Sequence, residues 1–329
     1  MAPTDSQERG ERPALDATLQ LLNTMGEGAV PAAAIYGLDG LSGEEIERLA
    51  TAWPSLDDDV RRRILFALGE AAEASFEFDF NPVGRMALGD PSGAVRALAV
   101  DLLWEDTSLD VMEQLLVMVR DDDAVDARVA AAIGLGQFVL MGELEEIDAG
   151  AFKRAQEILL DIFDDESEDI EVRRRALEAV SNSTTKRVEQ AIHEAYQSDE
   201  QRMKVSALFA MGCSADERWA PIVLDELGSD DRELRFEAAR AAGELELEDA
   251  IPALTQIVFD DDAEIRDVAV WSLGEIGGRE AKRVLQDLSE EARASDDDDL
   301  LNTIEDAIAS ANIGGDPALY LLDMDDQDE

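Results

Sequence analysis

The chain has 329 residues and carries 77 acidic side chains against 28 basic ones, so its formal net charge at pH 7 is −49. Nucleic acids and anionic membranes attract proteins largely through positive charge, and this composition therefore excludes a general role in binding either of them. Hydrophobic residues make up 46% of the sequence, which is enough for a buried core, whereas a single cysteine and a single histidine exclude an internal disulfide and a His/Cys metal site.

The beginning of the chain is expected to carry no targeting signal. Segment 1–13 is polar, is expected to be disordered, and has no apolar core of the length found in signal peptides. No stretch of the chain approaches about 18 uninterrupted apolar residues, so no membrane span is expected. We therefore expect a cytoplasmic protein. Residues 14–41 are expected to form helices that cap the repeats that follow.

From residue 42 to residue 311 one pattern recurs: an acidic cluster, an aliphatic residue, a basic residue, and small or apolar residues three, four and seven positions later. Those apolar positions lie on one face of an α-helix. A glycine or small residue at position eight is predicted to end that helix. The clearest copies are 31 residues apart and the upstream copies are more loosely spaced; their basic residues are Arg173, Lys204, Arg235 and Arg266, preceded by Arg61, Arg96 and Arg128.

A second apolar stretch lies between these helices in each repeat. Pro221 and Pro252 stand near its start in two copies, where a helix tolerates proline, and Ser42 with Glu45 predicts a capping box at the first copy. Each repeat is therefore a helical hairpin, which cannot bury two apolar stripes alone and must stack on its neighbours. We predict an all-α fold, a right-handed α-solenoid of about seven to eight hairpins, followed by an acidic tail over 312–329 that is expected to be disordered.

The segments DDDVRRRILFALGE (57–70) and DAEIRDVAVWSLGEIGG (262–278) resemble HEAT repeats, in the short form of bilin-lyase-like (PBS-lyase-type) proteins. The resemblance implies that the helix with the basic residue lines the concave side of the solenoid. It also implies that an aspartate and the basic residue connect neighbouring repeats, for which the candidates are Asp59, Asp123, Asp169, Asp230, Asp231 and Asp262.

On that helix, the positions one, two, five and nine residues after the basic residue point away from the predicted core. Several of them are apolar or aromatic, which is typical of a protein interface. Six of these residues fall on three consecutive repeats and are expected to form one patch: Val205, Phe209, Phe236, Arg240, Val268 and Trp271. The alternative is that curvature buries these side chains between repeats. The candidate partner-binding residues are Phe66, Ile133, Val205, Phe209, Phe236, Arg240, Val268 and Trp271.

Two basic pairs are candidates for contacts with an anionic group of a partner. They are Arg62 with Arg63 and Arg174 with Arg175. Pairing with the neighbouring acidic runs is the alternative that we favour. The longer step between Arg128 and Arg173 predicts an insertion at 141–150, either a longer loop or a helix extension.

Three functions are compatible with these features. The first is a non-catalytic scaffold that binds a peptide, helix or protein surface on its concave face, as a monomer or weak oligomer. The second, implied by the resemblance, is a bilin lyase or tetrapyrrole chaperone, and the third is an acidic decoy for basic proteins. We predict no catalytic residue, cofactor or metal: the chain has one His-Glu pair, His193-Glu194, too few for the di-iron hydroxylases of this fold, and Cys213 is expected to be structural.

Overall fold

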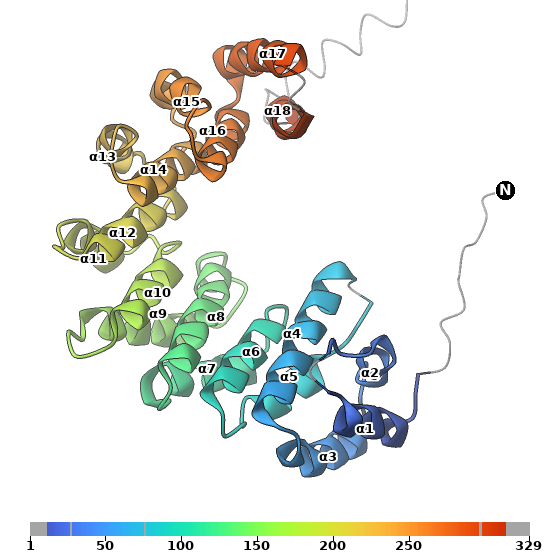
Figure 1. Cartoon of the computed structure of the whole chain (residues 1–329). Coiled ribbons are helices and arrows are strands. Elements are labelled where there is room, and N and C mark those ends of the chain that lie inside the picture. Colours follow the sequence, from blue (N-terminus) through green and yellow to red (C-terminus); the bar gives the residue numbers. More distant parts are fainter. Residues whose placement is uncertain (1–11, 27, 76, 296–297, 314–329) are drawn as a thin grey trace, which may run out of the picture. The chain divides into compact units, whose positions relative to one another are not determined.

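A computed structural model describes residues 12–26, 28–75, 77–295 and 298–313, which form two compact units that divide at Ala179 and Val180. Each unit is an array of helices (Figure 1). The first unit contains α1 (Leu15–Thr24), α2 (Ala32–Gly37), α3 (Gly43–Ala52), η1 (Trp53–Ser55), α4 (Asp58–Ala74), α5 (Asn81–Ala87), α6 (Gly93–Leu102), α7 (Leu109–Asp121), α8 (Val125–Glu143), α9 (Ala149–Asp164) and α10 (Ile170–Val180) up to its last residue. The second contains α11 (Lys186–Tyr196), α12 (Gln201–Cys213), η2 (Glu217–Trp219), α13 (Ala220–Glu226), α14 (Arg232–Glu244), η3 (Glu248–Ala250), α15 (Ile251–Ile257), α16 (Ala263–Ile276), α17 (Gly278–Ser295) and α18 (Asp298–Ile313).

The predicted all-α solenoid of hairpins is confirmed. From α3 to α18 the helices form eight consecutive pairs along the described chain, and no strand occurs in the described residues. The even-numbered helix of each pair up to α16 carries the basic residue, and the even-numbered helices of adjacent repeats pack on one another, α4 on α6 on α8 in one unit and α12 on α14 on α16 on α18 in the other. We call these the inner helices. Most of the predicted disordered segment 1–13, and nearly all of the tail 312–329, lie outside the described residues.

The capping box predicted at the first repeat is present. The Ser42 hydroxyl accepts a hydrogen bond from the Glu45 backbone N–H, and the Glu45 carboxylate accepts one from the Ser42 N–H. That backbone bond, together with bonds from Arg12 and the Ser42 hydroxyl, lowers the pKa of Glu45 to about 2. A sequence signal of four residues therefore fixes the start of α3.

The glycine at position eight has a different role from the one predicted. The residue that turns the chain after α14 is Glu246, with φ of 51°, and after α12 it is Ala215, with φ of 50°. The glycines instead lie where inner helices of adjacent repeats approach each other. A Cβ added at Gly243 would lie 2.9 Å from Ser272 Cα, and one added at Gly212 would lie 3.0 Å from Ala241 Cα. The 31-residue spacing thus brings a glycine against a small residue at position six of the next repeat.

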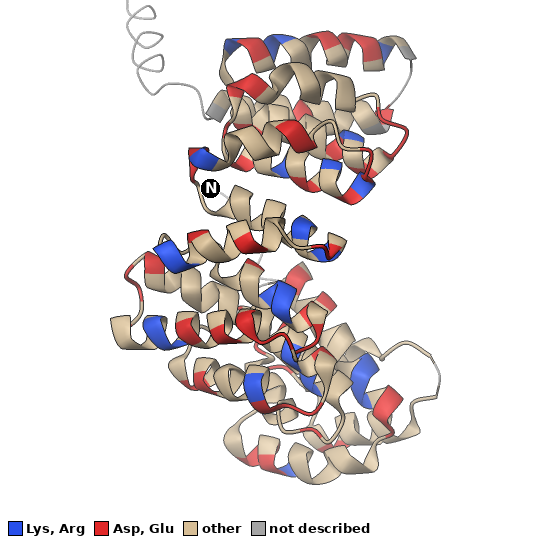
Figure 2. Cartoon of the chain, turned by 90° about the vertical axis from the view of Figure 1, so that its left-hand side faces the viewer, with Lys and Arg blue, Asp and Glu red and all other residues tan. Residues whose placement is uncertain are grey.

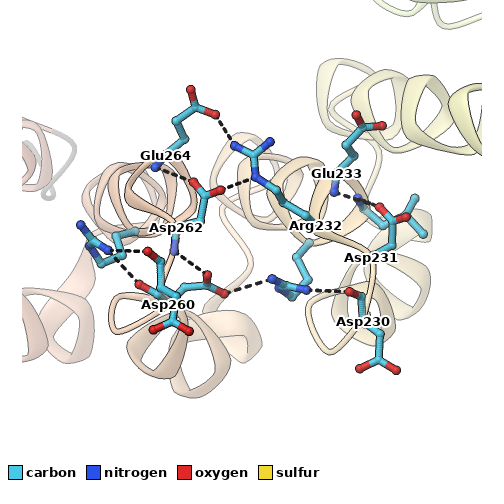
Figure 3. Close-up of polar contacts among 11 residues, drawn as sticks. Asp230, Asp231, Arg232, Glu233, Asp260, Asp262 and Glu264 are labelled. Atoms are coloured by element: carbon cyan, nitrogen blue, oxygen red, sulfur yellow. Dashed lines mark hydrogen bonds and ion pairs between the residues drawn. The ribbon is translucent and has the colours of Figure 1, made fainter.

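Arginine–aspartate ladders connect successive repeats. Asp122 accepts hydrogen bonds from Arg96 of the preceding repeat through its carboxylate, at 2.5 and 2.7 Å, while its backbone carbonyl accepts one from Arg128 of its own repeat at 2.7 Å. Burial raises the pKa of Asp122, but its bonds to Arg96 and to the Ala124 N–H outweigh burial and lower it below its ordinary value. In the second unit, Asp260 lies between Arg235 and Arg266 in the same way (Figure 3).

The connecting carboxylates are mostly not the predicted ones. They stand five or six residues before the basic residue of their repeat, and each binds the motif arginine of the preceding repeat; they are Asp90, Asp122, Glu168 and Asp260. Of the six predicted aspartates, Asp123 does contact the motif arginine Arg96 of the preceding repeat, at 2.7 Å. The prediction is wrong for Asp231 and Asp262 as partners of the motif arginine: both cap inner helices, and Asp262 also binds Arg232 (Figure 3).

Asp59, Asp169 and Asp230 also differ from the prediction. The Asp59 carboxylate binds Arg63 within its own helix at 2.9 Å. Asp169 accepts a hydrogen bond from the Glu171 N–H, and Asp230 binds Arg235 of its own repeat through its backbone carbonyl. These contacts order the start of an inner helix and do not reach the neighbouring repeat.

The insertion predicted at 141–150 contains the last residues of an extended α8, a turn, and the first residues of α9. Helix α8 continues to Glu143, and Asp148 then caps α9 by accepting hydrogen bonds from the Gly150 and Ala151 N–H groups. By length and composition α8 is the one helix in the described part of the chain that is apolar enough to cross a membrane. Its side chains Leu135, Phe138 and Val139 are fully buried, so part of this apolar character is used for packing within the unit, while Ile133 and Leu140 are exposed.

Candidate partner-binding face

Three predicted residues form a row across the inner helices of the second unit. Phe209 of α12, Arg240 of α14 and Trp271 of α16 each stand five residues after the basic residue of their repeat. Because these helices pack on one another in order, equivalent positions follow each other from helix to helix. We call these three residues the inner row. Trp271 is 37% exposed, and Phe209 and Arg240 are half-buried.

Arg240 is the best-anchored side chain of the inner row. Its guanidinium carbon lies 4.2 Å from the centroid of the Phe209 ring, a distance typical of a cation–π contact. The same guanidinium lies 3.5 Å from the carboxylates of Glu237 and Glu244, and 3.6 Å from the Cys213 sulfur. These contacts hold the Arg240 guanidinium over the aromatic ring of the preceding repeat.

Two of the candidate residues do not contribute to an exposed patch. Val205 is 8% exposed and Val268 is 9% exposed, so the prediction that they point away from the core is wrong. Helix α16, for example, packs on its own outer helix α15 and on the inner helices α14 and α18, so its buried arc is wider than the predicted one. On α16, Ser272 lies one turn beyond Val268 and donates a hydrogen bond to the Ala239 carbonyl of α14, so this side of α16 faces α14. Phe236 is half-buried.

The close approach of inner helices continues from α16 to α18. A Cβ added at Gly274 would lie 3.0 Å from Ala307 Cα, as one at Gly243 would approach Ser272. Ala307 is therefore the equivalent of Ser272, and Asp306 is the equivalent of Trp271. The last copy has no basic residue from which positions can be counted, so sequence analysis does not identify Asp306 as a residue of this face.

Two further candidates are exposed in the first unit. Phe66 of α4 is 58% exposed and Ile133 of α8 is 51% exposed, as predicted for position five of an inner helix. Phe66 lines a cleft of about 440 Å³ together with Val30 and Leu98. The cleft is mostly apolar, and Arg62 and Arg63 lie at its edge.

The basic pairs form the internal contacts that we favoured as the alternative. Arg62 binds Asp58 at 2.9 Å, and Arg63 binds Asp59 at 2.9 Å and the Gly26 carbonyl at 3.0 Å. In α10, Arg174 binds Glu171 at 2.9 Å and Arg175 binds Glu178 at 2.5 Å. These guanidinium groups are engaged within the chain.

The chemistry-bearing residues outside the row offer little for catalysis. Burial raises the pKa of the Cys213 thiol, although Arg240 beside it acts in the opposite direction. A thiol with a raised pKa is a poor nucleophile at neutral pH. No group of three or more His, Cys, Asp or Glu side chains with metal-binding geometry occurs in the residues that the structure describes.

Comparisons with known proteins agree with the fold. Residues 220–309 match the family of HEAT repeats. No curated protein matches the chain. Among solved structures, the complex of CpcE and CpcF of phycocyanin lyase from Nostoc is 17% identical over 70% of this chain and 94% of that chain, with a TM-score of 0.46.

Two further solved structures match the chain at low identity. Human deoxyhypusine hydroxylase is 19% identical over 80% of this chain and 95% of that chain, with a TM-score of 0.35. A chain of the Kap95–Nup1 complex is 11% identical over 93% of this chain and 46% of that chain, with a TM-score of 0.48. At these identities and TM-scores the likeness carries no functional information.

Proposed function

We propose that this chain, a HEAT-repeat protein, acts as a non-catalytic scaffold that binds a segment of a partner protein on the inner face of its second unit. The observation that carries the proposal is the inner row. Trp271 is exposed on a helix of a very acidic chain, and Phe209 and Arg240 adjoin it on the two preceding inner helices. Tryptophan and arginine are the residues most often found at the energetic centre of protein interfaces.

The rigidity of the row favours binding. Its residues stand on helices that pack through glycine–small contacts, and Arg240 is held by a ring, two carboxylates and a sulfur. A face that is ordered before binding loses less conformational freedom when a partner docks. Helix-borne side chains also hold their relative positions better than side chains on loops.

The lyase alternative receives less support from the site. Cys213, the one cysteine of the chain, is half-buried and has a raised pKa, and the predicted anion-binding arginines are paired internally. A propionate-bearing pigment would therefore have to displace existing ion pairs. Titration of the protein with free bilin, followed by absorbance, tests this alternative directly.

Affinity capture with a matched control tests the scaffold. The Phe209→Asp, Trp271→Asp variant places two charges on the row, and the Leu109→Asp, Leu144→Asp variant places two charges on apolar side chains that are 45% and 60% exposed in the first unit. We expect wild type and the control to recover the same partners and the row variant to lose them. The proposal fails if a folded row variant, verified by circular dichroism, recovers the wild-type set.

A further inference from the structure

The inner row contains an internal example of how its face recognises a cation. The ring of Phe209 is covered by Arg240, the equivalent residue of the next repeat, at 4.2 Å from guanidinium carbon to ring centroid. In the next repeat, the position equivalent to Arg240 is occupied by Trp271. In the repeat after that, on α18, the same position is occupied by Asp306. The aromatic ring of Trp271 is therefore followed by a carboxylate where the ring of Phe209 is followed by an arginine.

The surroundings of Trp271 are acidic on the side that faces solvent. Asp267 and Glu275 stand four residues before and after it on α16, a spacing that places all three side chains on the same helix face, and both are exposed. Asp306 is exposed on the adjacent inner helix α18. Asp267 and Asp306 form no ion pair among the described residues, while Glu275 accepts a hydrogen bond from the Ser310 hydroxyl. The nearest motif arginine, Arg266, is directed to the carbonyls of Asp260 and Asp261.

We propose that Trp271 forms the binding site for an arginine side chain of the partner protein. The guanidinium would stack on the indole as Arg240 stacks on Phe209, with Asp267, Glu275 and Asp306 as its counter-ions. Carboxylates alone attract any cation, whereas a flat aromatic ring favours the planar and weakly hydrated guanidinium over an ammonium group. The inference rests on the proposed binding role of the inner row and adds the chemistry of the residue that the partner contributes.

Titration of the full-length protein with a small probe tests the proposal without knowledge of the partner. The indole N–H signals of the four tryptophans are followed by NMR, and the Trp271 signal is assigned with a Trp271→Leu variant. The probe is acetyl-Gly-Arg-Gly-amide, and its control replaces arginine with citrulline, which has nearly the same shape and no charge. We expect a saturable shift of the Trp271 signal with the arginine peptide, a much smaller shift with the citrulline peptide, and no shift of Trp104, which is 48% exposed in the first unit.

Variants that replace aspartate with asparagine distinguish the effect of the carboxylates beside Trp271 from the effect of the overall negative charge of the protein. Asp267→Asn with Asp306→Asn should weaken binding of the arginine peptide about three- to tenfold, the size expected for two exposed counter-ions. Asp121→Asn with Asp126→Asn, which removes two exposed charges from the first unit, should change it less than twofold. The proposal is overturned by no saturable shift at Trp271, by equal shifts at Trp104, or by equal effects of the two double variants.

Failure of this inference is distinguishable from failure of the scaffold. If the Phe209→Asp, Trp271→Asp variant loses its partners while the Trp271 signal of the wild-type protein does not shift with the arginine peptide, the face binds protein by other chemistry, and only the inference about arginine is wrong. Retention of the partners by the row variant contradicts the scaffold itself, whatever the probe does.

Discussion

At the scale of single residues, the most informative positions are the glycines between inner helices. Gly243 faces the backbone of Ser272 at a distance that leaves no room for a methyl group, while Gly69 of α4 has open space at the same place. Since both lie within helices, the two sites differ in packing and hardly in backbone conformation.

Gly243→Ala should therefore destabilise the second unit, by about 1–3 kcal/mol for an overpacked site. Gly69→Ala, its control, should leave the first unit unchanged or more stable by up to about 1 kcal/mol, because alanine favours the helix. Native-state hydrogen exchange of α14 and α4 measures each effect in its own unit. Equal stabilisation by both substitutions would show that the inner helices do not approach as closely at Gly243 as described.

Two adjacent aspartates allow a matched test of the ladder. The side chain of Asp122 is 8% exposed and bound to Arg96, whereas Asp121 is exposed and has no bonded partner among the described residues. Asp122→Asn should lower the free energy of unfolding of the first unit by about 1–3 kcal/mol, because it removes the buried charge that pairs with Arg96 and leaves only the exposed carboxylate of Asp123 as its counter-ion. Asp121→Asn should stay within about 0.5 kcal/mol of wild type. Urea denaturation at pH 7 measures both.

The ladder also predicts how this difference depends on pH. Arg96 lowers the pKa of Asp122 in the folded protein despite burial, so the aspartate stabilises the fold above its ordinary pKa of 3.8. This contribution is lost as the pH falls through the lowered folded value. The gap between wild type and Asp122→Asn should be constant from pH 7 to about pH 5 and should close below about pH 4. A gap that grows with acid would contradict the sign of this pKa shift.

At the scale of the element, α8 carries both buried and exposed apolar side chains, so the contribution of burial to stability can be compared within one helix. Phe138 is fully buried and Ile133 is 51% exposed. We expect Phe138→Ala to destabilise the first unit by about 3–5 kcal/mol and Ile133→Ala by less than about 0.5 kcal/mol, both measured by urea denaturation. Similar losses at the two positions would mean that Ile133 is covered, and that its exposure at position five does not hold.

The hairpins could be predicted from the sequence because helix and repeat periods depend on local patterns. The 31-residue spacing from Arg173 to Arg266, the prolines and the Ser42 capping box each report on one helix. The connecting carboxylates could not be chosen among so many acids, because the choice of Asp122 over its neighbours depends on where Arg96 and Arg128 reach. Val205 and Val268 were misplaced for a related reason: the width of a buried arc depends on how many helices surround it, which a helical wheel does not contain.

At the scale of the whole molecule, the acidic charge dominates. Figure 2 shows acidic segments on the helices and loops of both units, with basic segments between them. Only 28 basic side chains are present for 77 acidic ones, so most carboxylates have no cation to pair with. Several arginines pair with carboxylates in the ladders between repeats, and others pair within one helix, so the excess carboxylates leave the surface negative. Repulsion among these charges opposes the compact state.

Salt should therefore stabilise this protein, because ions shorten the range of charge repulsion from about 30 Å at 0.01 M to about 3 Å at 1 M. We expect the Tm measured at pH 7 to rise with NaCl over this range, by about 2–4 °C for each kcal/mol of repulsion that is screened. Sucrose of equal osmolality is the control, since it strengthens burial through exclusion from the surface but screens no charge. A Tm that is independent of NaCl, or that rises equally with sucrose, would show that the ladders and the spacing of the carboxylates already neutralise the repulsion.

The same salt series applied to a captured partner distinguishes two modes of recognition. A decoy for basic proteins would release its partner steeply as salt rises, whereas a segment held by stacking and apolar contact on the inner row would be released only partly.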